Sequence, residues 1–301
     1  MTDIEIESFL AIVHAGSISK AAVELYTSQS SLSRRIQSLE AELGFQLFIR
    51  NKGNRSVRLT KAGMAFIDIA AKWKSLWKDM QNIGSLDNKT ILNISVINSV
   101  NAYIMPGFLQ KFILDNPWIY LTVRSVPSLD TFRYIENGIV DLALFSDDSY
   151  ISNSKMRPAY SEQLLLVCHK DTVLPEEVSP EMFDISKNLY LPWNREYEAW
   201  HHRWFPASKR SRVWFNNIKL MEEFLLHDYW AIVPASAAHK MALEPGLSVH
   251  TILNGPPPRI IYYLLGPYPK SDISRMFLTS FDQHLKRNHS NDVISLIDLG
   301  M

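Results

Sequence analysis

Side chains suited to covalent or metal chemistry are few in this sequence, and their spacing argues against catalysis. Cys168 and His169 are neighbours in a strand-like stretch, so they point to opposite faces and do not form a thiolate–imidazole pair. His201 and His202 are also adjacent, whereas two metal ligands on a helix need a spacing of three or four residues. The chain has no glycine-rich phosphate loop, serine-centred elbow or HExxH motif. We therefore expect no catalytic residues, no metal site and no cofactor.

The chemistry that the sequence does favour is hydrogen bonding to the edges of DNA bases. Residues 28–43 form a predicted helix, with Ser28 as its N-cap and Gly44 just beyond its end. An apolar stripe runs along one face: Leu32, Ile36, Leu39 and Leu43. The other face is polar: Gln29, Ser30, Ser33, Arg34 and Gln37. Amide and guanidinium groups on an apolar back are what a recognition helix needs to reach the major groove.

The elements around this helix complete the pattern of a winged helix-turn-helix. Residues 3–15 predict a first helix that ends at Gly16, and Ser17 or Ser19 caps a short second helix through Leu25. Apolar residues on both sides of an Asn/Gly-rich turn, over residues 45–59, indicate a two-stranded wing. Four basic residues of the wing are expected along the phosphate backbone or in the minor groove: Arg50, Lys52, Arg55 and Arg58.

The charge distribution agrees with a local nucleic-acid contact. The net charge is zero, but residues 28–61 hold seven basic against two acidic residues. With one cysteine the chain forms no intramolecular disulfide, which fits a reducing compartment. The first residues lack the basic and apolar pattern of a signal peptide, so we expect none, and the sequence has no apolar run of the roughly 20 residues needed to cross a bilayer. We expect a cytoplasmic protein without a membrane partner.

Residues 61–82 predict a long helix with a heptad seam, followed by a hinge over residues 84–88. The seam residues predicted to form a dimer interface are Phe66, Trp73, Leu76 and Met80. The alternative is a helix whose apolar face packs on its own domain.

Residues 91–288 alternate strand-like and helix-like segments, which indicates a mostly parallel α/β sheet. Eight strands are expected: 92–97, 119–123, 140–145, 164–168, 189–191, 213–215, 230–233 and 260–265. Such sheets bind ligands at the carboxyl ends of their strands.

The N-terminal 60 residues closely resemble the DNA-binding domain of the LysR family of transcription regulators. The matching motifs are Gly16-Ser17, Ala21-Ala22, Ser28-Gln29, Leu32-Ser33, Ile36, Leu39-Glu40, Leu43-Gly44, Leu47-Phe48, Arg50, Leu59-Thr60 and Gly63. The resemblance continues more loosely through Gly138, Asp141-Leu142-Ala143 and Pro234. Two positions depart from it: Ser30 stands where the family commonly has proline, and His227-Asp228-Tyr229 replaces a Gly-x-Gly.

The resemblance implies a winged helix-turn-helix over residues 1–60, a linker and dimerisation helix with hinge over 61–87, and a periplasmic-binding-protein-like α/β sensor over 88–301. One lobe is expected at about 90–160 with 268–301, and the other at about 161–267. The implied DNA-facing residues are Gln29, Ser30, Ser33, Arg34, Arg35, Arg50, Arg55 and Arg58. Of the two helix arginines, Arg34 is favoured for reading bases and Arg35 for phosphate. The implied effector-binding residues are Asn98, Ser99, Ser128, Trp193 and Asn194.

The function implied is a regulator that binds double-stranded operator DNA and a small-molecule effector. It would assemble with itself, as a dimer or a tetramer, and could contact RNA polymerase. The tryptophan-rich stretch 193–205 predicts either core packing or an aromatic pocket wall, because its aromatic residues recur at helical spacing. The alternative function is a ligand-binding module whose winged helix makes protein contacts only.

Overall fold

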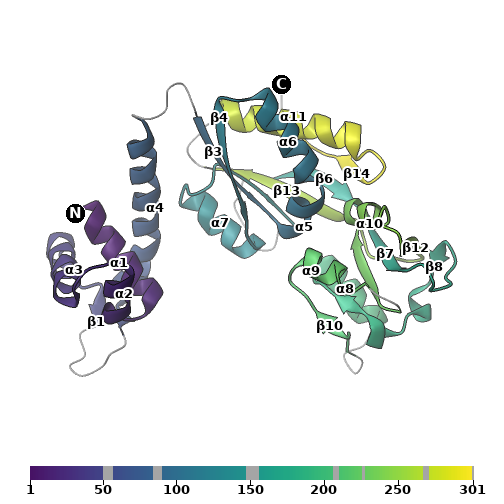
Figure 1. Ribbon diagram of the computed structural model, residues 1–301, viewed down its shortest axis with the longest axis horizontal. Coiled ribbons are helices and arrows are strands. Elements are labelled where there is room, and N and C mark those ends of the chain that lie inside the picture. Colours follow the sequence, from purple (N-terminus) through teal and green to yellow (C-terminus); the bar gives the residue numbers. More distant parts are fainter. Residues whose placement is uncertain are drawn as a thin grey trace. The chain divides into compact units, whose positions relative to one another are not determined.

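The computed structural model describes residues 1–49, 57–83, 90–146, 156–205, 210–225, 228–266 and 271–299. The chain forms two compact units, one made mainly of residues 1–89 and the other of residues 90–135 and 140–301. Figure 1 shows both units with their helices and strands labelled.

The first unit is a helical domain with a small two-stranded sheet. Its elements in chain order are α1 (Asp3–Ala15), α2 (Ile18–Glu24), α3 (Gln29–Leu43), β1 (Phe48–Ile49), β2 (Arg58–Leu59) and α4 (Lys61–Ile83). Their apolar faces share one core in which Phe9 contacts both Phe48 and Phe66, at ring-centroid distances of 5.4 and 5.1 Å.

The predicted helix ends in this unit are confirmed. Ser17 and Ser28 are the N-caps of α2 and α3, and their side chains accept hydrogen bonds from the amides of Lys20 (3.2 Å) and Ser31 (3.1 Å). Gly16 and Gly44 end α1 and α3 in the left-handed conformation, with φ of 66° and 77°. A residue with a Cβ is strained there, so glycine is the fitting C-cap.

A buried carboxylate joins α3 to the strand β1. Glu40 accepts hydrogen bonds from the amides of Leu47 (2.7 Å) and Phe48 (3.2 Å), so the turn after α3 has a fixed path. The amide of Thr60 donates to the Leu47 carbonyl at 3.0 Å, which places the start of α4 directly against that carbonyl. A Cβ on Gly63 would lie 2.1 Å from the same oxygen, so only glycine fits.

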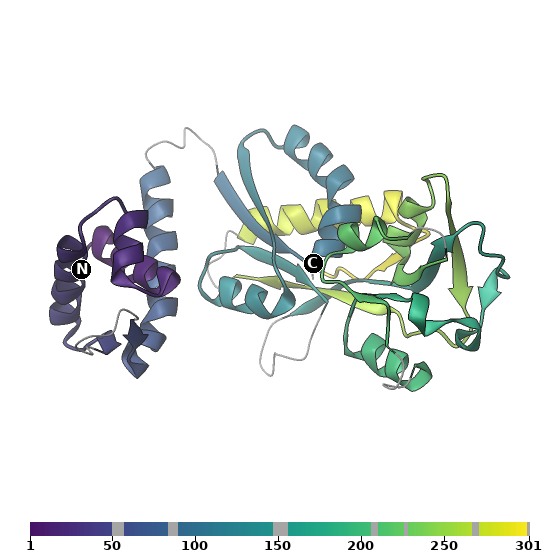
Figure 2. The same cartoon turned by 60° about the horizontal axis from the view of Figure 1, so that its bottom comes forward.

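The second unit has two lobes, and the first lobe is built on a six-stranded sheet. The strand order is β14 (Val293–Ser295), β6 (Arg157–Glu162), β13 (Arg259–Leu265), β5 (Leu142–Phe145), β3 (Thr90–Val96) and β4 (Ile119–Ser125). Helices α6 (Met105–Asp115) and α11 (Ser271–Asn288) lie side by side on one face, and α7 (Ser128–Glu136) lies on the other, as Figures 1 and 2 both show. The short helix α5 (Asn98–Tyr103) follows β3 directly.

The second lobe holds a smaller sheet and most of the aromatic core. A four-stranded sheet has the order β11 (Trp230–Pro234), β7 (Leu164–His169), β12 (Leu247–Ile252) and β8 (Glu177–Val178). The pair β10 (Val213–Trp214) and β9 (Leu189–Tyr190) lies apart from it in the hydrogen-bonding pattern. The helices are α8 (Arg195–Trp204), α9 (Ile218–Glu222) and α10 (Ala235–Met241), with 3-10 turns η1 (Pro180–Met182) and η2 (Ile185–Lys187).

Two expectations about this unit were wrong. The sheets are mixed rather than mostly parallel, because β13 pairs antiparallel with both β5 and β6, and β7 pairs antiparallel with β11 and β12. Strand β13 was placed in the second lobe, which was expected to extend to residue 267, but its backbone hydrogen bonds place it inside the sheet of the first lobe. Strands β6, β8, β12 and β14 were not predicted, and β6 carries the first lobe through residue 162.

We expect Gly63→Ala to destabilise the first unit by about 1–3 kcal/mol, because the new methyl group meets the backbone oxygen of Leu47 rather than a side chain that can rotate. Gly107→Ala is the matched control, since its Cβ would meet only the His284 ring, at 3.6 Å. Hydrogen exchange of the amides in α1 to α4 measures the first unit separately from the second. Equal exchange in wild type and Gly63→Ala would contradict the close contact.

Candidate nucleic-acid interface and ligand cavity

The polar face predicted for α3 is on the surface of the first unit. Gln29, Ser30 and Arg34 are exposed and Ser33 is half-buried, so all four can be approached from outside. Within the described part of the chain, Arg34 has no carboxylate partner, and its guanidinium keeps all its donors for another molecule. Ser30, which replaces the proline common in the family, lies 3.0 Å from the hydroxyl of the N-cap Ser28.

Arg35 differs from Arg34 although the two are neighbours. Arg35 is half-buried, and its Nη1 lies 3.5 Å from the hydroxyl of the buried Ser8 in α1. The guanidinium is therefore turned toward the domain's own first helix, and a phosphate contact would require it to swing outward.

The wing is present as an antiparallel pair in which Phe48 faces Leu59 and Ile49 faces Arg58. Arg58 is exposed on β2, where a basic side chain can meet a phosphate. Arg50 and Arg55, with Lys52, lie outside the described residues.

Helix α4 has two apolar faces rather than one seam. Phe66 is 3% exposed in the core of its own unit, so its assignment to a dimer seam was wrong. Trp73 packs against the same core and stacks on Trp77 at a centroid distance of 6.4 Å. Leu76 and Met80, both selected for dimerisation, are about half exposed, at 54% and 50%. An exposed stripe therefore runs along the helix through Ile69, Leu76 and Met80, beside the buried face.

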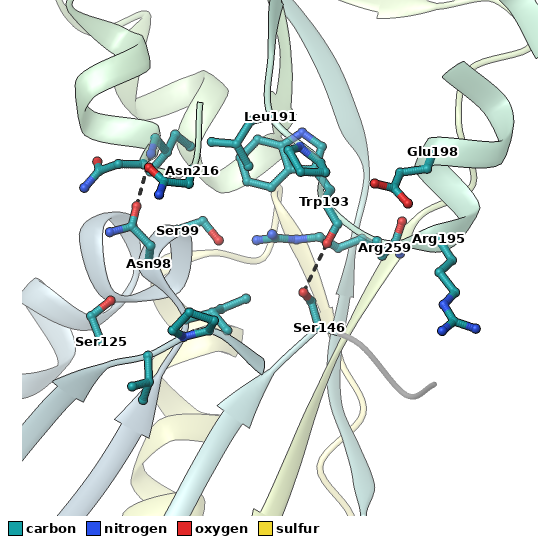
Figure 3. Close-up of a pocket in the computed structure, with 17 residues that line it drawn as sticks. Asn98, Ser99, Ser125, Ser146, Leu191, Trp193, Arg195, Glu198, Asn216 and Arg259 are labelled. Atoms are coloured by element: carbon teal, nitrogen blue, oxygen red, sulfur yellow. Dashed lines mark hydrogen bonds between the residues drawn. The ribbon is translucent and has the colours of Figure 1, made fainter. Parts of the chain in front are cut away.

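A cavity of about 610 Å³ lies between the two lobes of the second unit (Figure 3). The structure places four of the five predicted effector residues on its wall: Asn98, Ser99, Trp193 and Asn194. Asn98 and Ser99 belong to α5 of the first lobe, while Trp193 and Asn194 precede α8 of the second. Ser128 is the first residue of α7, directly after the lining residue Pro127.

Several lining residues were not predicted. Arg259 is the first residue of β13, Ser146 follows β5, and Asn216 and Asn217 precede α9. Asn217 could have been found, because an asparagine before an apolar helical segment is an N-cap signal. Arg259 could not, because it reaches the cavity only through strand pairings between segments far apart in the sequence.

The tryptophan-rich stretch serves mainly as core. Tyr197 and Trp200 are buried in the second lobe, and Trp193 is the one aromatic residue of the stretch 193–205 that lines the cavity. Its indole nitrogen donates to the Ile232 carbonyl at 2.7 Å, and the Arg259 guanidinium lies 5.1 Å from its ring. Both contacts hold the ring at the cavity wall with its polar atom satisfied.

Hydrogen bonds join the two lobes around the cavity. Asn98 Oδ1 accepts from the amide of Ile218 at 3.1 Å, and Ser146 Oγ donates to the Trp193 carbonyl at 3.2 Å (Figure 3). Tyr103 of α5 donates its hydroxyl proton to the carboxylate of Glu222 in α9. Because these bonds cross from one lobe to the other, opening the cleft would break them.

The residues first considered for covalent or metal chemistry are placed apart from this cavity. Cys168 is buried in β7, and burial raises the pKa of its thiol, which disfavours the nucleophilic thiolate. The described residues contain no group of three or more His, Cys, Asp or Glu side chains that could hold a metal ion. Of His227-Asp228-Tyr229, His227 lies outside the described residues, and Asp228 forms an ion pair with Lys187.

Two family models match the chain. The bacterial regulatory helix-turn-helix model of the lysR family matches residues 5–64, and the LysR substrate binding domain model matches residues 87–272. The chain belongs to the LysR family. No single described helix is long and apolar enough to cross a membrane. The two helices α1 and α2 together have the required length and apolarity, but the chain bends sharply between them.

Related proteins carry regulatory names. A probable nitrogen assimilation transcriptional activator of Synechocystis sp. is 32% identical over 173 residues, which cover 56% of this chain and 55% of that protein. A carbapenem-hydrolyzing beta-lactamase transcriptional activator of Enterobacter cloacae is 28% identical over 281 residues, covering 87% and 85%. The match to the first of these spans little more than half of the relative's length.

Solved structures share the fold of the whole chain. Full-length CbnR in complex with its target DNA aligns with a TM-score of 0.67 and 19% identity, covering 95% of this chain and 99% of that one. A variant of full-length OxyR from Pseudomonas aeruginosa aligns at 0.61 and 17%, covering 93% and 94%. These similarities show the architecture expected from the sequence, a helix-turn-helix unit followed by a two-lobed α/β unit.

Acid is expected to destabilise the second lobe through His201. Burial, and to a lesser extent the neighbouring His202, lowers the pKa of this imidazole to about 4 from an ordinary 6.5. The unfolded chain therefore binds a proton that the folded chain rejects, and stability falls as the pH drops from about 7 to 4. At about 1.4 kcal/mol for each pKa unit, the loss is roughly 3 kcal/mol.

Replacement of His201 by phenylalanine should remove this part of the pH dependence, whereas His202→Phe, at an exposed neighbour, should retain it. Urea unfolding at pH 7 and pH 5, followed by tryptophan fluorescence, measures both. The same pH slope in His201→Phe and wild type would contradict a neutral, buried imidazole.

Proposed function

We propose that this chain is a sequence-specific DNA-binding transcriptional regulator whose second unit responds to a small-molecule effector. The observation that carries the proposal is the exposed polar face of α3, with an unpaired Arg34, on a domain that matches the family's helix-turn-helix model. A guanidinium held in this way can donate two hydrogen bonds to a guanine edge in the major groove. A regulator that binds operator DNA would act in the cytoplasm, where it could also contact RNA polymerase.

The second unit supports effector sensing rather than catalysis. The cavity between its lobes has the size of a small-molecule site, and its wall combines an indole face with several amide and hydroxyl groups. A ligand that fits one lobe arrangement better than another shifts their populations, and so changes what the attached DNA-binding unit does. We propose that the effector is bound and released unchanged, and that no metal or cofactor is needed.

The exposed stripe of α4 supports self-association. Ile69, Leu76 and Met80 are about half exposed, next to the face of the helix that is already buried in its own unit. A second copy of the same helix would cover this stripe and bring two recognition helices into one particle, as operators with two half-sites require.

Arg34→Ala should weaken specific operator binding about 5- to 150-fold for each half-site that the arginine reads, because a bidentate arginine–base pair contributes about 1–3 kcal/mol. The assay is a gel-shift titration with a duplex selected in vitro for binding to the wild-type chain. Arg203→Ala removes an equally exposed arginine from α8 and should leave the affinity unchanged. Wild-type affinity in Arg34→Ala would contradict base reading by this residue.

The double variant Ile69→Ala and Leu76→Ala should shift the protein toward monomer, because it removes apolar area from the pairing surface at about 25 cal/mol per Å². Sedimentation velocity at micromolar concentration follows the shift. The control variant Val173→Ala with Leu243→Ala removes two apolar side chains that are even more exposed, in the second unit, and should sediment as wild type. An unchanged distribution in the α4 variant would show that another surface holds the copies together.

A further inference from the structure

Three of the four asparagines on the cavity wall, Asn98, Asn194 and Asn217, have already used their acceptor oxygens within the protein. Asn98 Oδ1 accepts from the Ile218 amide at 3.1 Å, and Asn217 Oδ1 accepts from the amides of Lys219 and Leu220 at 2.9 and 3.2 Å. Asn194 Oδ1 accepts from the Tyr197 amide at 2.9 Å. What each of these side chains has left for a ligand is its NH₂ group, which only donates. Among the described residues none of the three NH₂ groups has a partner.

Two of these donors are at the same end of the cavity. Asn98 bonds to the amide of Ile218, the residue that follows Asn217, so both asparagines lie where α5 of one lobe approaches α9 of the other.

Arg259 adds donors of a different kind. Its Nε and Nη2 both donate to one oxygen of Glu162, at 3.0 and 2.6 Å, which leaves Nη1 without a partner in the described part of the chain. The guanidinium extends beneath Trp193 and points toward Ser99 in Figure 3. Its charge is balanced by Glu162, but its free N–H groups still face the cavity.

The one carboxylate on the described wall lies at the other end. Glu198 is in α8 of the second lobe, and in Figure 3 it lies on the far side of Trp193 from Asn98. Glu198 shares its end of the cavity with Arg195, whereas the end formed by α5 and α9 has the amide NH₂ groups of Asn98 and Asn217 and no carboxylate on the described wall.

We infer that the effector carries a carboxylate or a comparable planar oxyanion, received by the NH₂ groups of Asn98 and Asn217 and by Nη1 of Arg259. This inference rests on the proposed effector-sensing function and names its ligand class. A ligand with few acceptors would bury these donors unpaired, which disfavours its binding. An oxyanion satisfies them with charge-assisted bonds, which are roughly twice as strong as neutral ones. The uncharged remainder of the ligand contacts Trp193, Leu191 and Ile218.

The test compares matched probes that differ only in this one group. Benzoate, benzamide and benzylamine form one set, and butyrate, butyramide and butylamine form another. Each is titrated into the full chain at fixed ionic strength and pH 7, with the melting temperature and the dissociation constant as readouts. In each set the carboxylate should bind at least about tenfold more tightly than the amide or the amine, a difference of about 1.4 kcal/mol.

Asn98→Asp then reverses the chemistry at one atom. Aspartate keeps an oxygen for the Ile218 amide, and so keeps the bond between the lobes, but it presents an oxyanion where asparagine presents NH₂. Carboxylate binding should fall at least about tenfold and amine binding should rise. Asn101→Asp makes the same change on the same helix at a residue that does not line the cavity, and it should bind the probes as wild type does.

The ligand class is wrong if amides bind as tightly as carboxylates, if Asn98→Asp binds carboxylates as tightly as wild type, or if no carboxylate binds at about 50 mM, a concentration well above the millimolar range of weak small-ligand binding. Operator affinity of the unliganded protein is measured in parallel. If any of these results is found while operator binding is intact, the proposed regulatory function stands and only the proposed oxyanion ligand is contradicted. If the protein binds neither carboxylates nor operator DNA, the proposed regulatory function is contradicted as well.

Discussion

The ion pair between Glu162 and Arg259 is the interaction on which the second unit depends. The two residues are direct cross-strand partners on β6 and β13, at the two places where the chain crosses between the lobes. Their side chains are 0% and 1% exposed, so neither charge is screened by water. Such a pair is costly to desolvate and persists only when further hydrogen bonds satisfy it. Ser236 provides one, donating its hydroxyl proton to the second Glu162 oxygen at 2.7 Å.

The cavity follows from this arrangement. Ser236 lies in the first turn of α10 of the second lobe, so the carboxylate of one lobe is bonded to a helix of the other. Arg259 lies against the ring of Trp193, whose indole nitrogen is bonded to β11 and whose carbonyl is bonded to Ser146 of the first lobe. The pair thus sets the position of the indole wall, and the lobes meet around the cavity rather than closing it with packed side chains.

Local signals in the sequence predicted local structure well. The helix ends at Gly16, Ser28 and Gly44 depend on residues within one turn of the cap, and they were found where expected. The strands β6, β12 and β14 were missed, since a strand is defined by its neighbours and these neighbours lie far away in the sequence. The effector residues predicted at strand ends lie on the cavity wall, because a strand end can be recognised from the nearby sequence. The place of Arg259 could not be predicted in this way, because it depends on the order of the strands in the sheet.

Helix α4 shows a second limit of periodicity. A repeat near 3.5 residues marks an apolar face, but a helix that is buried on one side and exposed on the other carries two such faces that interleave in the sequence. Phe66 and Leu76 belong to different faces although both fit one heptad pattern. Only the tertiary contact between Phe66 and Phe9 separates the core face from the exposed stripe.

In the proposed effector site, Asn98 would link ligand recognition to the contact between the lobes. Its oxygen is bonded to Ile218 across the cleft, and its NH₂ group faces the cavity. A ligand that accepts from the NH₂ group also orients the amide for its bond to the other lobe, so binding and the closed arrangement stabilise each other. That coupling is the differential affinity that any effector response needs, and each factor of ten in the response corresponds to about 1.4 kcal/mol. Asn98 therefore lies where a ligand contact and a contact between the lobes share one side chain.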